Sequence, residues 1–100
     1  MAYVKLKLVT IIAETVLEES LCREILELGA TGYTVTETHG RGTKGIRTGQ
    51  VPGESVRIEA LVSQEAADAI VAHLRERYFE DYAVIAWLEE VEAVRGSKYA

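Results

Sequence analysis

The sequence predicts an α+β fold made of two halves, each consisting of a strand, a helix and a second strand. Three observations support this prediction. Four stretches have the alternating or β-branched composition of strands, two have apolar residues at helical spacing, and one long glycine-rich connection separates the halves. The 100 residues are 48% apolar, which suffices for one domain with its own core over residues 1–100.

The first half begins with a predicted strand at Val4, followed by a helix. Apolar residues alternate with lysines from that point, and the apolar run continues to Ile12. Thr15 and Glu18 have the spacing of a capping box, and Gly29 is a suitable helix terminator. The apolar stripe of this helix consists of Leu17, Leu21, Ile25 and Leu28.

Three strands and a second helix complete the prediction. Tyr33–Thr38 is rich in threonine and valine, and Ser55–Val62 alternates between apolar and polar residues, so both are predicted strands. Ser63 is suited to cap the second helix, and the fourth strand is predicted over Tyr82–Val94. The apolar stripe of the second helix consists of Ala66, Ala67, Ile70, Val71, Leu74 and Tyr78.

This order of elements is that of a ferredoxin-like fold, in which both helices cover one face of a four-stranded sheet. The first and last strands, interpreted as the outer strands, carry apolar residues in both phases of the alternation. These are Val9, Ile11 and Ile12 in the first strand and residues 84–88 in the last. Strands that are apolar on both sides are usually buried on both sides. We therefore expect the chain to self-associate. The alternative is that the second face of the sheet remains exposed to solvent.

The connection His39–Glu54 is far longer than most connections in a compact domain. It contains five glycines, the only proline and three cations, Arg41, Lys44 and Arg47, although the net charge of the chain is −5. Glycines let successive backbone N–H groups turn toward one anion, and arginine adds a planar fork. The connection is therefore predicted to be flexible and to bind a phosphorylated ligand. The alternative is a solvated hairpin with incidental basic residues. A strand on either side of Gly40–Gly45 excludes the dinucleotide-binding interpretation of its G-x-G-x-x-G pattern.

Several segments resemble PII signalling proteins. Gly29-Ala-Thr-Gly-Tyr-Thr-Val-Thr-Glu and then Gly40-Arg-Gly resemble the second strand of that family and the entry to its T-loop. Val56-Arg-Ile-Glu resembles the strand that leaves the T-loop, and Glu89-Glu-Val-Glu-Ala-Val-Arg95 resembles the last strand. The resemblance implies a ferredoxin-like trimer that binds adenine nucleotides in clefts between subunits, with a flexible T-loop at about 39–54.

Within this family the chain resembles the PII-like carbon-sensing branch, which includes the SbtB proteins and the carboxysome-associated PII-like proteins. Gly40-Arg-Gly-Thr-Lys-Gly-Ile-Arg47 is similar to their T-loop, and Tyr78-Phe-Glu-Asp-Tyr-Ala to their stretch before the last strand. Nitrogen-regulatory PII proteins have there a glycine-rich turn with a lysine for ATP. The resemblance implies binding of AMP, ADP or cyclic AMP, with bicarbonate as a further ligand, and regulation of bicarbonate uptake or of a carboxysome-linked partner.

The resemblance also assigns the nucleotide-binding residues. Thr34 and Leu61 would lie near the adenine or ribose. The residues expected around the phosphate are Gly40, Arg41, Gly42, Thr43, Lys44, Arg47 and Arg95. The implied protein partner is a membrane bicarbonate transporter, contacted through the T-loop. The single cysteine allows no intrachain disulfide and fits a cytoplasmic location.

Other functions receive less support from the residues. Catalysis is not expected, because Cys22 is predicted to be a helix core residue and neither His39 nor His73 accompanies a nucleophile. A CutA-like trimeric metal-binding protein is an alternative, because that family shares the topology. Its candidate ligands here would be Glu37, His39 and Cys22, which do not have a recognisable metal-binding spacing. A nitrogen-regulatory PII protein is another. The net charge of −5 and the lack of aromatic residues over Val56–Val62 disfavour nucleic-acid binding.

Overall fold

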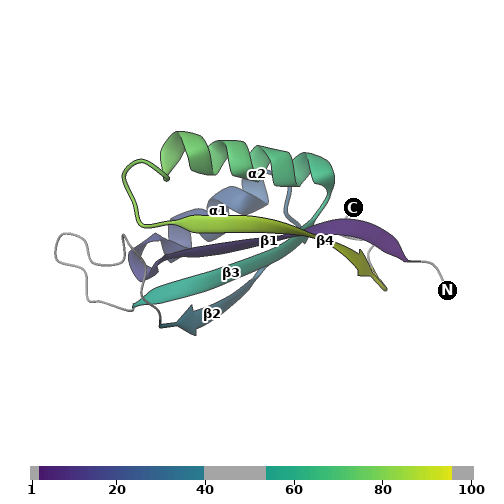
Figure 1. Ribbon diagram of the computed structural model, residues 1–100, viewed down its shortest axis with the longest axis horizontal. Coiled ribbons are helices and arrows are strands. Elements are labelled where there is room, and N and C mark those ends of the chain that lie inside the picture. Colours follow the sequence, from purple (N-terminus) through teal and green to yellow (C-terminus); the bar gives the residue numbers. More distant parts are fainter. Residues whose placement is uncertain (1–2, 40–53, 96–100) are drawn as a thin grey trace.

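A four-stranded antiparallel sheet covered on one face by two helices forms the fold of this protein (Figure 1). The computed structural model describes residues 3–39 and 54–95. Its elements are β1 (Val4–Glu14), a 3₁₀ helix η1 (Thr15–Leu17), α1 (Glu18–Glu27), β2 (Thr34–Thr38), β3 (Ser55–Val62), α2 (Gln64–Arg77) and β4 (Ile85–Ala93). The strand order β2-β3-β1-β4 is that of a ferredoxin-like fold, so the predicted α+β class is confirmed.

The core lies between the sheet and the two helices. Alternate residues of β1 and β3 point toward the helices, and Ile11 lies directly opposite Ile58 in the antiparallel pairing. The predicted helix stripes supply the other half of this core. The largest fully buried side chains of this core are Val9, Ile11, Leu21, Ile25, Val56, Ile58, Val62, Ile70 and Leu74. Thr10 is also fully buried, but it lies on the other face of the sheet.

The start of α1 differs from the prediction. No side-chain capping bond forms at Thr15 or Glu18, so the predicted capping box was wrong. The reason is that Thr15 opens η1, and α1 is entered from a residue, Leu17, that already has helical φ and ψ. A preceding helical turn takes the place of the extended cap residue that a capping box requires.

The end of α1 agrees with the prediction. Ala30 N–H donates to Ile25 O at 3.0 Å and Gly29 N–H donates to Leu26 O at 3.3 Å, which is the bond pattern of a Schellman motif. Gly29 has φ of +122°, and a Cβ there would lie 2.9 Å from the Cβ of Ala66. Glycine is required both by the backbone conformation and by the close approach of α2.

The second half follows the prediction at the start of α2 and departs from it before β4. Ser63 Oγ accepts a hydrogen bond from Ala66 N–H at 3.2 Å, as expected of an N-cap. The predicted strand over Tyr82–Val94 begins only at Ile85. Tyr82 N–H instead donates to Tyr78 O at 2.9 Å, so these residues complete a turn after α2 before the chain can pair with β1.

The uncovered face of the sheet is lined by apolar and charged side chains. β1 lies between β3 and β4, so its interpretation as an outer strand was wrong. Trp87 and Glu59 flank Thr10 on this face. The guanidinium of Arg57 lies 5.5 Å from the Trp87 ring centroid, and Thr10 beneath is fully buried with its hydroxyl unpaired.

Candidate functional site

An open pocket lies where β2 begins, on the uncovered face of the sheet. Its volume is about 710 Å³. Strand pairing sets Thr34 opposite Glu59, and Leu8 opposite Leu61. Directly opposed residues of an antiparallel pair point to the same face, so these four side chains share one wall. The residues that line the pocket are Leu8, Thr31, Gly32, Tyr33, Thr34, Glu59, Ala60 and Leu61.

The pocket arises because β3 is longer than its neighbour β2. Pairing between the two strands starts at Thr34 and Glu59, whereas β3 continues to Val62. The chain before Thr34 turns away toward the end of α1, and this divergence opens the pocket. Over Ala60–Val62, β1 is therefore the one strand partner of β3 among the described residues. The free side of β3 presents backbone groups that could bond to the edge of a planar ring.

The electrostatics of the pocket suit a base and a sugar better than a phosphate. Glu59 supplies a carboxylate whose side chain is 30% exposed, and Leu8 and Leu61 supply apolar surface. Lysine and arginine are absent from the described lining, and the nearby Arg57 is 3.5 Å from Glu59 and extends over Trp87. A phosphate bound beside this pocket would need its cations from elsewhere.

The structure brings two of the predicted site residues together. Thr34 and Leu61, both assigned to the adenine or ribose, line this single pocket. Arg95 is exposed and follows the end of β4, outside the lining of the pocket, so its assignment stays a prediction. Gly40, Arg41, Gly42, Thr43, Lys44 and Arg47 lie outside the described residues, as does all of the predicted T-loop apart from its ends.

Sequence reasoning missed several lining residues, of which Glu59 is the most informative. Glu59 precedes Leu61 by two positions, so the strand period alone places both on one face. The sequence predicts Tyr33 as the first residue of a strand, whereas the strand β2 begins at Thr34 and Tyr33 is 44% exposed beside the pocket. Its position depends on the turn after α1, which the alternation pattern does not report.

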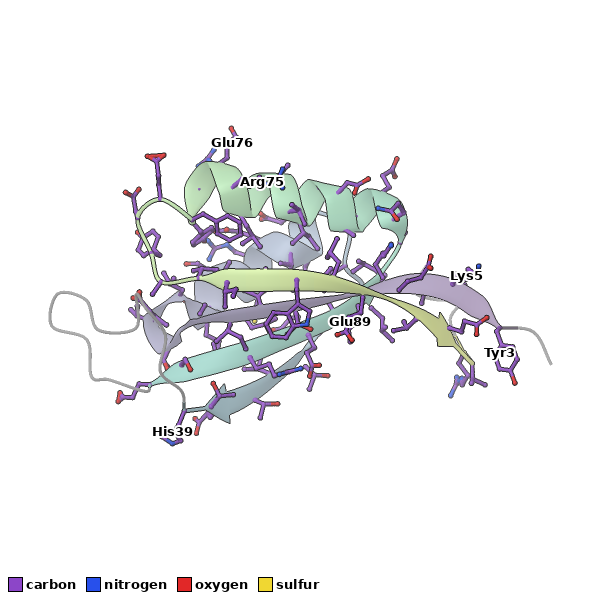
Figure 2. All side chains as sticks on the ribbon, in the orientation of Figure 1. Tyr3, Lys5, His39, Arg75, Glu76 and Glu89 are labelled. Atoms are coloured by element: carbon purple, nitrogen blue, oxygen red, sulfur yellow. The ribbon has the colours of Figure 1, made fainter. Side chains whose placement is uncertain are left out.

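The residues weighed for metal binding are not brought together. Cys22 is buried in α1, and burial raises the pKa of its thiol. Figure 2 shows His39 just beyond the end of β2, and Tyr3 and Lys5 at the opposite end of the sheet. Among the residues that the structure describes, no group of three histidine, cysteine, aspartate or glutamate side chains could hold a metal ion.

A second polar cluster lies between the helices, away from the pocket. Glu24 Oε1 is 2.6 Å from His73 Nε2 and accepts a hydrogen bond from the hydroxyl of Tyr78 at 2.7 Å. Burial opposes ionisation of Glu24, but the bonds from His73 and Tyr78 outweigh it and lower the pKa of the Glu24 carboxyl. Burial and the bond to Glu24 raise the pKa of Tyr78 to about 12. This cluster ties α1 to the end of α2, and its three side chains do not include an activated nucleophile.

Within residues 3–39 and 54–95, neither α1 nor α2 is long and apolar enough to cross a bilayer.

The family model for nitrogen regulatory protein P-II matches residues 6–98. A PII-like protein from Thermus thermophilus, with a suggested signalling role, is 50% identical over 100% of both chains, with a TM-score of 0.86. CPII from Thiomonas intermedia K12, solved with ADP and bicarbonate, is 22% identical over 99% of this chain and 98% of its own, with a TM-score of 0.84. B. subtilis GlnK, solved with ATP, is 20% identical over 87% of this chain and 82% of its own, with a TM-score of 0.66.

Proposed function

This chain belongs to the nitrogen regulatory protein P-II family, and on that premise we propose that it is a PII-like signalling protein that binds AMP, ADP or cyclic AMP. The observation that carries the proposal is the meeting of Thr34 and Leu61 in one pocket. Resemblance alone assigned both residues to the adenine or ribose, and the packing of β1, β2 and β3 independently brings them to the same place. CPII, which has been solved with ADP and AMP, shares the fold and supports this choice of ligand.

The proposed site divides recognition between two parts of the molecule. The pocket takes the base and ribose, because it offers apolar walls, the free side of β3 and the Glu59 carboxylate as an acceptor for a sugar hydroxyl. The phosphate is taken by the cations of the T-loop, of which Arg47 is the strongest candidate, because arginine can donate two parallel bonds to phosphate oxygens.

The site is completed in a homotrimer. The pocket is one-sided in a single chain, and the uncovered sheet face exposes Ile85 by 59% and Trp87 by 37%. A sheet face with such residues is stabilised by contact with other copies of the chain. We propose that residues of a neighbouring subunit complete the pocket in this arrangement. Sedimentation equilibrium at micromolar concentration tests the assembly, and a species that stays monomeric would remove the intersubunit site.

The regulatory role proposed is control of inorganic-carbon uptake, exercised in the cytoplasm on a membrane bicarbonate transporter or a carboxysome-linked partner. Bicarbonate is the proposed second ligand, supported by the CPII structure that holds ADP and bicarbonate. The fold is more similar to that CPII structure, with a TM-score of 0.84, than to B. subtilis GlnK, with a TM-score of 0.66. The stretch Tyr78–Ala83 also lacks the glycines of an ATP-binding turn. The protein is proposed to act without catalysis.

Calorimetric titration with ADP, AMP and adenosine tests the division of the site. Arg47→Ala is expected to weaken ADP and AMP binding by about 1.5–3 kcal/mol, the range for hydrogen bonds to charged groups, and to leave adenosine binding unchanged. Arg47→Lys should restore part of the loss, since lysine keeps the charge but not the planar fork.

Leu61→Ser is the complementary variant in the pocket. It should weaken adenosine and ADP by similar factors, because it removes apolar contact with the base and leaves the phosphate contacts in place. Thermal melts and sedimentation confirm that each variant folds and assembles. Wild-type binding of ADP by a folded Arg47→Ala protein would refute the phosphate role, and wild-type binding by Leu61→Ser would refute the pocket.

A further inference from the structure

A second open groove lies along α1, on the other side of Tyr33 from the nucleotide pocket. Its volume is about 610 Å³, and its walls come from η1, α1 and the start of β2. Tyr33 lines both hollows, so the two share one side chain. The residues that line this α1 groove are Thr15, Val16, Glu18, Glu19, Cys22, Arg23, Leu26 and Tyr33.

The α1 groove exposes large apolar side chains. Val16 is 75% exposed, Leu26 is 43% exposed and Tyr33 is 44% exposed. These residues differ from the buried apolar residues of η1 and α1 in the core, Leu17, Leu21 and Ile25. Core packing therefore does not explain their apolar character. Clustered exposed apolar residues with a polar rim are typical of protein interaction sites.

The charge of the α1 groove is predominantly negative. Glu18 and Glu19 stand at its rim in the first turn of α1. The one cation of its lining, Arg23, is 3.6 Å from the carboxylate of Glu24, which lies outside the groove and balances part of its charge. An apolar floor with an acidic rim is complementary to a segment that carries apolar and basic side chains together.

We propose that the α1 groove docks an amphipathic segment of a partner protein, and that this segment is rich in lysine or arginine. We further propose that nucleotide bound in the neighbouring pocket changes the affinity of the groove for this segment through Tyr33. The first part stands on the groove alone; the second rests on the proposed nucleotide site. Most residues of the groove come from η1 and α1. Figure 1 shows that the helices cover one face of the sheet, whereas the proposed trimer buries the other face. Docking and assembly therefore use different surfaces.

The docking test uses a fluorescent synthetic peptide of leucine and lysine at helical spacing, with a control peptide in which glutamate replaces lysine. Fluorescence anisotropy without nucleotide should show binding of the lysine peptide only. Glu19→Lys should weaken it about fivefold, since an attractive exposed charge becomes repulsive. Glu65→Lys is the matched control, because Glu65 is also an exposed acid in the first turn of a helix. It should change binding by less than about twofold.

A second pair of variants tests the apolar floor. Leu26→Ser should weaken the peptide about tenfold, whereas Val94→Ser, which alters an exposed apolar residue outside the groove, should have no effect. Thermal melts establish that the variants fold. Equal binding of both peptides, or wild-type affinity in Glu19→Lys and Leu26→Ser, would overturn the docking proposal.

The coupling is measured by repeating the titration with saturating ADP. We expect a change in peptide affinity of about fivefold or more, and linkage requires the peptide to change ADP affinity by the same factor. Tyr33→Ala should abolish this change. Unaltered peptide affinity in a protein that binds ADP would overturn the coupling but leave docking intact. Absence of ADP binding would instead contradict the proposed nucleotide site.

Discussion

The two faces of the sheet are built from the same strands but differ in how far their apolar side chains are buried. On the helical face, Ile11 and Ile58 are each 1% exposed, and the two helices account for their burial. On the other face, Ile85 is 59% exposed and Trp87 37% exposed, while Thr10 is buried with an unpaired hydroxyl. The helical face is a closed core, whereas the other face carries exposed apolar side chains that no element of the described residues covers. The comparison indicates that the fold and the assembly depend on opposite faces.

The largest expected effect on protomer stability comes from shortening an isoleucine on the helical face, with an isoleucine on the uncovered face as its comparison. Ile58→Ala should lower the free energy of unfolding by about 2–5 kcal/mol, because it leaves a cavity in the closed core. Ile85→Ala should change the unfolding of the protomer by less than about 0.5 kcal/mol, as is usual for exposed positions, but should weaken the trimer. Urea denaturation and sedimentation measure the two effects separately. A similar loss of protomer stability in both variants would contradict the comparison.

An intermediate effect is expected from the tie between the helices. Glu24→Gln should lower the free energy of unfolding by about 1.5–3 kcal/mol near neutral pH, since the charged acceptor of two bonds is lost. The pKa of Glu24 is lowered in the folded state, so its stabilisation is present above the ordinary value of 4.5 and is lost as pH falls through the folded value. The difference between wild type and variant should therefore shrink below about pH 4.5.

Glu27→Gln is the control for this acid-dependent term, because Glu27 is an exposed glutamate in the last turn of the same helix. It should leave the dependence of stability on pH close to that of wild type. Denaturation midpoints between pH 3 and 7 provide the measurement. An equal loss of acid dependence in both glutamine variants would show that the Glu24 cluster is not its source.

The smallest expected effect concerns Thr10 on the uncovered face. Thr10→Val replaces the unpaired hydroxyl by a methyl group of similar shape, so it should raise the free energy of unfolding by about 1 kcal/mol. Thermal and urea denaturation of the assembled protein measure it. Destabilisation instead would show that the hydroxyl has a hydrogen-bond partner and would contradict this prediction.

The pattern of the sequence was sufficient for most of the fold, because strand and helix periods are local properties. Alternation located β3 at its observed bounds, and Gly29 and Ser63 marked helix ends correctly, since each acts through bonds to residues within a few positions. Prediction from the local pattern was wrong where a neighbouring element used the same residues. The capping box gave way to η1, and the first residues of the predicted last strand were used in the turn after α2.

For the candidate site, the resemblance of the sequence to a family predicted two strand residues, Thr34 and Leu61. That both line one pocket follows from the tertiary structure, because pairing of β2 with β3 brings together residues that are distant in the chain. The tertiary structure likewise placed β1 inside the sheet, brought Glu24 to His73 and set Tyr33 between two hollows. Each of these depends on contacts between residues distant in sequence, which local periodicity does not encode.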